Sequence, residues 1–361
     1  MLKYNLSDSI VLLLPLSEFD PPAAGDSILL VVYSLEACLI TCYGFAAIFI
    51  IKALHKVRAL HFNLRCLMLL FLFNSLLYIA ARAVCLTYLT GIVPIKGSFE
   101  EDKLLIASSI IRLFCVWTDG GEVVMTLMER TYATVFAAFY EKSRGRIDLL
   151  ALFILPCLIE SAVGTAIGSV ALITDRLDFL HNSMQFVVIG AQMSLAIYMY
   201  LLVWRVNVAL QTYLRGGFST VTERLARAEM RLVAMSRHRV NSLPHKYQIR
   251  ENLRVFRMFA GAALMGCSVS TVGFVALLLL LYVDFSTASG RNYTAATIGI
   301  CCTLLNTVSI PAVMLHCPEW RAIFLRSIGF HHLASLRKRT KIVNRYTAHE
   351  HFQQLRDIFW K

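Results

Sequence analysis

Charged residues are scarce in this chain, and histidine avoids its long apolar runs. Only 16% of the residues are charged, whereas 57% are hydrophobic, a composition typical of membrane proteins rather than soluble domains. Of the ten histidines, only His316 reaches the edge of an apolar run. Metal-dependent and nucleophilic hydrolases need His, Asp or Ser clustered at one depth. This distribution therefore argues against an enzyme, and we expect neither a metal nor a cofactor.

The sequence also lacks a disulfide framework. Nine of the ten cysteines lie inside the apolar runs, where a thiol acts as a small buried side chain. The tenth, Cys317, follows the last run directly. It is a candidate for S-palmitoylation, with an unmodified thiol as the alternative.

The chain contains seven apolar runs that are each long enough to cross a bilayer. A helix needs roughly 20 apolar residues to span a hydrocarbon core of about 30 Å, and it satisfies its own backbone hydrogen bonds in lipid. The runs are 28–51, 66–90, 104–128, 147–173, 185–204, 258–283 and 294–316. The sequence thus predicts an all-α membrane protein with a seven-transmembrane helix bundle at 28–316. A tail at 1–27 precedes the bundle, and an amphipathic helix with a C-terminal tail follows it at 317–361.

The basic residues are distributed unevenly between the two ends of these runs. The N-terminal tail and the even-numbered loops hold five of the 35 Lys and Arg residues, whereas the odd-numbered loops and the C-terminal tail hold 28. Cytoplasmic loops carry the excess of Lys and Arg, so we expect an extracellular N-terminus and a cytoplasmic C-terminus. The excess of basic residues on the expected cytoplasmic side thus accounts for the net charge of +12, and nucleic acid is not an expected partner. Asn5 and Asn292 begin glycosylation sequons on the expected outer side.

Several ionisable residues lie inside the apolar runs, where they are costly and are usually paired or functional. Glu36, Arg82 and Arg112 come from the first three runs, and each lies about 12 Å below the outer surface at a rise of about 1.5 Å per residue. Asp119 shares a helix face with Arg112. We interpret these four residues as ligand-binding candidates on the floor of a polar pocket. An interhelical salt bridge that only fixes packing is the alternative.

A second group of candidates lies at the cytoplasmic side. Glu129 and Arg130 end the third run, and a guanidinium that is always charged can bind neighbouring helices or a docked partner. Glu251, which precedes the sixth run, is the expected resting partner of Arg130. Arg250 and Arg254 lie on one face of the same segment and can meet a G protein or anionic lipid. The alternative for Arg130 is a snorkelling side chain at the membrane boundary.

The seventh run contains a candidate activation hinge. Asn306 precedes Pro311 by five residues, and a proline in a membrane helix frees backbone carbonyls and permits bending.

These motifs resemble those of a receptor family. The series Glu129-Arg130, Ala133-Thr134 and Tyr140-Glu141 is similar to the signature of nematode serpentine chemoreceptors. Three further blocks resemble the epsilon class, Sre: Tyr247-Gln248, Glu251-Asn252-Leu253-Arg254 and the end of the chain from Glu350 to Trp360. The resemblance implies a G-protein-coupled chemosensory receptor with Arg130 as the arginine of an Asp/Glu-Arg motif.

The sequence departs from the rhodopsin-like pattern in three places. The second outer loop, 174–184, has no cysteine, and the sixth run lacks both Trp and Pro. Ile310 and Met314 stand where Asn and Tyr normally flank the proline of the seventh run. The usual disulfide and aromatic toggle are therefore not expected here.

We expect a multi-pass plasma-membrane receptor, in the sensory cilium of a neuron, that binds an environmental small molecule and signals to a heterotrimeric G protein. An endogenous peptide or amine is the alternative ligand. A seven-span ligand-gated channel of the insect odorant-receptor type requires the opposite orientation, which the charge distribution opposes. A transporter would favour internal repeats, and the sequence shows none.

The orientation can be tested with an epitope tag on each terminus. Because the basic loops are expected in the cytoplasm, antibody should reach an N-terminal tag on intact cells and a C-terminal tag only after permeabilisation. The reverse pattern would contradict the receptor orientation and favour the channel.

Overall fold

The computed structural model describes residues 3–7, 10–13, 27–56, 62–96, 100–135, 140, 147–173, 178–214 and 288–316. Short pieces between 252 and 279, and the single residues Arg321 and Arg326, are also described. Most of the sixth predicted run, the loop before it and the C-terminal segment after His316 lie outside this set.

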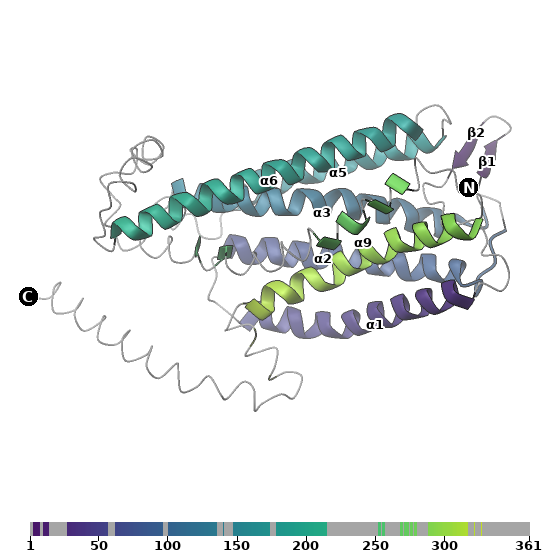
Figure 1. The fold of residues 1–361 in the computed structure, drawn as a ribbon, viewed down its shortest axis with the longest axis horizontal. Coiled ribbons are helices and arrows are strands. Elements are labelled where there is room, and N and C mark those ends of the chain that lie inside the picture. Colours follow the sequence, from purple (N-terminus) through teal and green to yellow (C-terminus); the bar gives the residue numbers. More distant parts are fainter. Residues whose placement is uncertain are drawn as a thin grey trace, which may run out of the picture.

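Six long helices of the described part lie side by side along one axis (Figure 1). They are α1 Ser27–Lys56, α2 Phe62–Leu89, α3 Lys103–Val135, α5 Ile147–Ile173, α6 Asp178–Leu214 and α9 Ala288–His316. Each overlaps one predicted run, and α6 extends furthest beyond it. Hydropathy marks only the lipid-embedded part of a helix, whereas backbone hydrogen bonding continues past that boundary.

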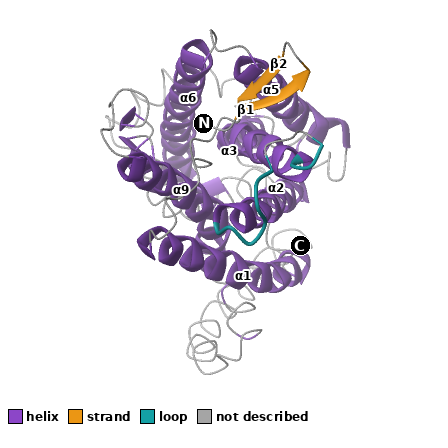
Figure 2. Ribbon diagram, turned by 90° about the vertical axis from the view of Figure 1, so that its right-hand side faces the viewer, coloured by secondary structure: helices purple, strands orange, loops and turns teal. Residues whose placement is uncertain are grey.

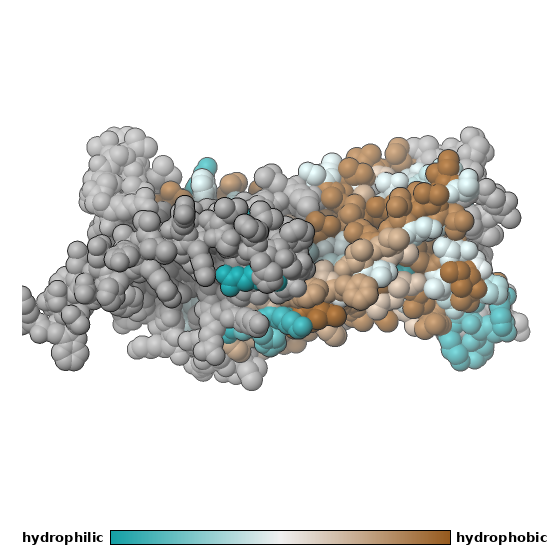
Figure 3. Space-filling model, turned by 90° about the horizontal axis from the view of Figure 1, so that it is seen from below, coloured by the Kyte–Doolittle hydropathy of each residue, from teal (hydrophilic) through white to brown (hydrophobic). Residues whose placement is uncertain are grey.

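The described helices have the surface that a bilayer requires. Four of them contain stretches long and apolar enough to cross a membrane, namely Ser27–His55, Phe62–Leu89, Lys103–Thr134 and Asn292–Met314, and α5 contains a shorter apolar stretch, Ala151–Ile167. Leu35, Phe45 and Val187 are each more than 60% exposed. Figure 3 shows a broad hydrophobic area between hydrophilic residues on either side. An exposed apolar surface of this extent is suited to contact with lipid.

A short β-hairpin precedes the bundle, where the sequence analysis expected only a tail. Strand β1, Lys3–Ser7, pairs antiparallel with β2, Ile10–Leu13, so that Lys3 lies opposite Leu13 and Ser7 opposite Ile10. β-branched residues such as those at 10 and 11 favour strands. The hairpin lies at the end of the bundle where α1 begins, and β2 contacts α5 (Figure 1).

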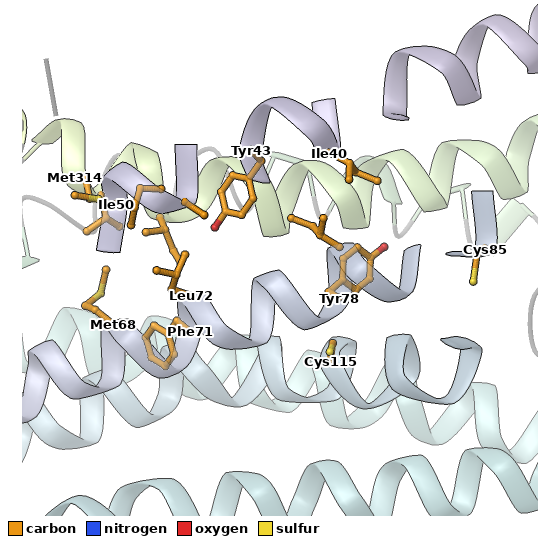
Figure 4. Close-up of a cluster of buried hydrophobic side chains, with 14 of the residues drawn as sticks. Ile40, Tyr43, Ile50, Met68, Phe71, Leu72, Tyr78, Cys85, Cys115 and Met314 are labelled. Carbon is orange, nitrogen blue, oxygen red and sulfur yellow. The ribbon is translucent and has the colours of Figure 1, made fainter. Parts of the chain in front are cut away.

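Helix α3 is the centre of the described bundle. It packs against α2, α5 and α6, while α1 and α9 pack against each other and against α2 (Figure 2). The largest buried apolar cluster joins α1, α2, α3 and α9. Figure 4 shows its members Ile40, Tyr43, Ile50, Met68, Phe71, Leu72, Tyr78, Cys85, Cys115 and Met314. Every polar side chain of α3 that faces inward therefore has several helices within reach.

Two glycines let α3 and α5 approach closely. A Cβ atom on Gly164 of α5 would lie 2.6 Å from the ring of Trp117 on α3, and one on Gly121 of α3 would collide with Cys157 of α5. Small residues at helix interfaces allow such close backbone contact in membranes.

We expect Gly164→Ala to lower the melting temperature of the detergent-solubilised protein. The added methyl overpacks the interface at Trp117, a change that typically costs about 1–3 kcal/mol. The matched control is Gly44→Ala on α1, because a Cβ at Gly44 meets nothing within 4 Å and Ala is the better helix former. Equal effects of the two substitutions would contradict the close α3–α5 contact.

Candidate functional site

An ion pair in the outer half of the bundle joins α1 to α2. Arg82 donates from Nε to Oε1 of Glu36 at 2.8 Å and from Nη2 to Oε2 at 2.9 Å. Both side chains are fully buried, and the hydroxyl of Thr303 on α9 donates to Glu36 Oε1 at 2.5 Å. A bidentate geometry with an additional hydrogen bond is what a buried pair needs to offset its desolvation. Three helices are held together by these contacts.

Arg112 of α3 contacts Tyr78 of α2, which also lies near Arg82 and Glu36. Its guanidinium carbon is 5.9 Å from the centre of the Tyr78 ring on α2, a cation–π distance, and only 5% of the residue is exposed. For Glu36 and Arg82 the geometry matches the packing alternative considered above. A ligand-binding role for these residues stays a prediction.

The middle of the bundle contains a second polar cluster, centred on Asp119 of α3. Asn74 of α2 donates to Oδ1 and Asn306 of α9 donates to Oδ2, each at 2.8 Å. Glu122 follows one turn later on the same helix face. Asn306, predicted as part of a hinge with Pro311, thus connects α9 to α3, and Pro311 lies inside α9 five residues further on.

At the cytoplasmic end of α3, Arg130 is completely buried in a dense network. It donates from Nε and Nη2 to the two carboxylate oxygens of Glu129 at 2.5 Å each, and from Nη1 to the amide oxygen of Asn252 at 3.1 Å. Nη2 also donates to the hydroxyl of Tyr140 at 2.9 Å, and that hydroxyl donates to Glu129. Arg130 is therefore not a snorkelling side chain in this structure.

Asn252 extends the network to α6. Its amide nitrogen donates to the hydroxyl of Thr134 at 2.7 Å and to Oδ1 of Asn207 at 3.3 Å. Asn207 donates to the same hydroxyl at 3.2 Å, and Thr134 donates to the backbone oxygen of Arg130 at 2.8 Å. The segment that precedes the sixth run is thus attached to both α3 and α6.

Aromatic contacts hold Tyr140 in place. Tyr132 of α3 packs edge-on against Tyr140 and against Phe153 of α5, with ring centroids 6.4 and 6.0 Å apart. Tyr140 and Phe153 belong to one buried apolar cluster. Residues of α3 and α5 therefore position the Tyr140 hydroxyl that accepts a hydrogen bond from Arg130.

The remaining predicted residues are placed as follows. Arg250, Glu251, Arg254 and Cys317 lie outside the described residues. Asn5 lies within β1. Asn292 lies within α9 and is only 6% exposed, so its placement does not favour attachment of a glycan.

Several residues of these clusters were not singled out as site candidates. Thr134, Tyr140 and Asn252 do stand in the blocks that carry the family resemblance, and that was the available signal. The others are neutral polar residues whose types occur in many membrane helices, and no spacing distinguishes them. They are Asn74, Asn207 and Thr303.

A helical bundle with an apolar surface, a buried ion pair between α1 and α2 and a buried Glu-Arg pair at the end of α3 fits the class of seven-transmembrane receptors. The chain belongs to the Sre family of G-protein-coupled chemoreceptors, which matches residues 1–357. It is also similar to serpentine receptor class epsilon-1 of Caenorhabditis elegans, with 23% identity over 283 residues that cover 75% of this chain and 70% of that protein. The predicted family and seven-transmembrane fold are thereby confirmed, and the protein is a multi-pass membrane protein.

We expect strong energetic coupling between Glu36 and Arg82. Glu36→Gln or Arg82→Met alone leaves a buried charge without its partner and should cost about 3–5 kcal/mol, whereas the double variant should cost less than the sum. The measurement is a double-mutant cycle on thermal unfolding in detergent.

The exposed pair Lys96–Glu101 is the control for this cycle. Its side chains are 55% and 50% exposed, and such pairs contribute at most about 1 kcal/mol. Additive effects at Glu36 and Arg82 would contradict the buried pair.

Proposed function

We propose that this protein detects a small molecule in the outer half of its helix bundle and activates a heterotrimeric G protein at its cytoplasmic end. Its proposed location is the plasma membrane, in the cilium of a sensory neuron. The observation that supports this most strongly is the Arg130 network, which joins α3, α6 and the segment at 252–256 where a G protein would dock.

In this proposal the structure represents the resting state. Arg130 is 0% exposed, so a docked partner reaches its guanidinium only after Asn252 and Tyr140 have moved away. A hydrogen bond to a charged group contributes about 1.5–3 kcal/mol. Loss of one such bond therefore shifts a two-state equilibrium by on the order of tenfold or more, because about 1.4 kcal/mol corresponds to a factor of ten.

Helix α9 offers a route from the ligand to this network. Thr303 bonds to Glu36 in the outer half and Asn306 bonds to Asp119 in the middle of the bundle. The two residues are three positions apart, so a movement of α9 changes both contacts together. A ligand that binds near Arg112 and Tyr78 would bias α9 and α3 toward one of two arrangements.

The role of the network can be tested by nucleotide exchange on a panel of G-protein α subunits, with the full-length receptor in membranes and without added ligand. Tyr140→Phe removes the phenol that accepts from Arg130 and donates to Glu129, and it should raise basal exchange several-fold. Arg130→Ala should abolish exchange, alone and in combination with Tyr140→Phe.

The matched control is Tyr198→Phe, since Tyr198 lies on α6 and is 65% exposed, away from the network. It should leave basal exchange unchanged. Full exchange by Arg130→Ala, or no effect of Tyr140→Phe in a receptor that does catalyse exchange, would contradict the assigned roles. Absence of exchange from every variant on every α subunit would contradict G-protein coupling itself.

A further inference from the structure

The outer halves of the seven apolar runs carry a net positive charge. Their ionisable residues are Glu36, Arg82 and Arg112, with no other Asp, Glu, Lys, Arg or His. These halves are 28–39, 78–90, 104–116, 161–173, 185–194, 271–283 and 294–305. The sum is one positive charge, whichever of the three side chains pair with one another. Because charge in a low-dielectric interior must be balanced, this depth of the bundle is suited to an anion.

The acidic residues closest to Arg112 along α3 are engaged elsewhere. Asp102 and Asp119 lie about 15 Å and 10 Å from it along the helix axis, at about 1.5 Å per residue. The carboxylate of Asp102 accepts hydrogen bonds from the backbone nitrogen of Lys96. The carboxylate of Asp119 accepts hydrogen bonds from the asparagines of α2 and α9 described above.

The one carboxylate in the outer halves of the runs, that of Glu36, is already occupied. Oε1 accepts hydrogen bonds from Arg82 at 2.8 Å and from Thr303 at 2.5 Å, and Oε2 accepts one from Arg82 at 2.9 Å. A cationic amine would have to displace Arg82 to reach this carboxylate, and it would add a second positive charge to the region. The contacts therefore disfavour the amine that was considered as an alternative ligand.

Hydrogen-bond donors that lack an acceptor lie in the same region. Tyr78 is fully buried and its hydroxyl has no hydrogen-bond partner among the described residues, although a buried tyrosine hydroxyl usually finds one. The guanidinium of Arg112 lies 5.9 Å from the centre of the Tyr78 ring. Arg112 makes other contacts as well, yet its buried Nε–H donates to no acceptor among the described residues. An anion with hydrogen-bond acceptors satisfies both donors and supplies the missing charge.

We propose that the ligand is a small carboxylic acid whose carboxylate binds to Arg112 and Tyr78 between α2 and α3. This inference rests on the proposed ligand site in the outer half of the bundle and adds the chemical class of the ligand. A guanidinium matches the geometry of a carboxylate, and the phenol donates one further hydrogen bond. Tyr78 and Cys115 belong to the largest buried apolar cluster, so the rest of the ligand is apolar. Because Arg112 is only 5% exposed, the ligand enters when these helices move from their resting arrangement.

The test measures the melting temperature of the purified full-length receptor in detergent. The probes are butyrate, hexanoate, benzoate and phenylacetate, compared with their methyl esters and with the amines of the same carbon skeletons. At least one acid should raise the melting temperature by a few degrees in a saturable manner, whereas its ester and amine should not. Arg112→Gln should abolish this rise, and Arg112→Lys, which keeps the charge, should retain part of it. Tyr78→Phe should weaken binding about tenfold, and it serves where Arg112→Gln does not fold.

The matched controls are Arg205→Gln and Tyr198→Phe, because both residues are exposed on α6. These variants should bind the acid as the unmodified receptor does. The proposal is overturned if no acid stabilises the receptor, if Arg112→Gln and Arg205→Gln respond equally, or if chloride alone stabilises as much as any acid. Binding of an ester or an amine in place of the acid would overturn it while leaving small-molecule detection intact. No G protein is present, so the result is also independent of the proposed coupling.

Discussion

The structure depends on one constraint, that every charge inside the bundle must be balanced within a medium that offers almost no water. Arg82 meets this constraint through Glu36, and Arg130 meets it through Glu129. The first pair also determines which helices are neighbours, because Glu36 and Arg82 come from α1 and α2 and share Thr303 of α9. Apolar contacts alone specify helix neighbours less strictly, since lipid competes equally well for apolar side chains.

Helix α3 carries the polar contacts at every depth of the membrane. Arg112 faces α2 in the outer half, Asp119 joins α2 to α9 in the middle, and Arg130 meets the segment at 252 near the cytoplasm. Because α3 is one continuous helix of 33 residues, a small rotation about its axis affects all three depths together. The central position of α3 thus gives a physical basis for coupling between the two ends of the bundle.

The sequence predicted the elements of the bundle better than their contacts. Hydropathy placed the helices because lipid demands long apolar runs, and the common depth of Glu36 and Arg82 followed from the rise per residue. The contacts of Arg130 depend on how each helix is rotated about its own axis. Along a helix, each step of one residue turns the direction of the side chain by about 100°. Glu251, expected on charge as the resting partner of Arg130, lies outside the described residues and stays a prediction, whereas the neighbouring Asn252 accepts a hydrogen bond from Arg130. Thr303 and Asn74 carry no charge, so nothing in the sequence marked them.

The neutrality of Asn252 has a consequence for switching. Separation of a buried ion pair leaves an unbalanced charge and costs about 3–5 kcal/mol, whereas loss of one hydrogen bond to a charged group costs about 1.5–3 kcal/mol. Glu129 precedes Arg130 directly on α3 and accepts two of its hydrogen bonds, so the balancing carboxylate moves with the arginine. Loss of the hydrogen bond to Asn252 then leaves Arg130 with the carboxylate of Glu129 still bound. For the proposed function, this means that a small ligand has to supply only the free energy of one such hydrogen bond to disrupt the contact of Arg130 with Asn252.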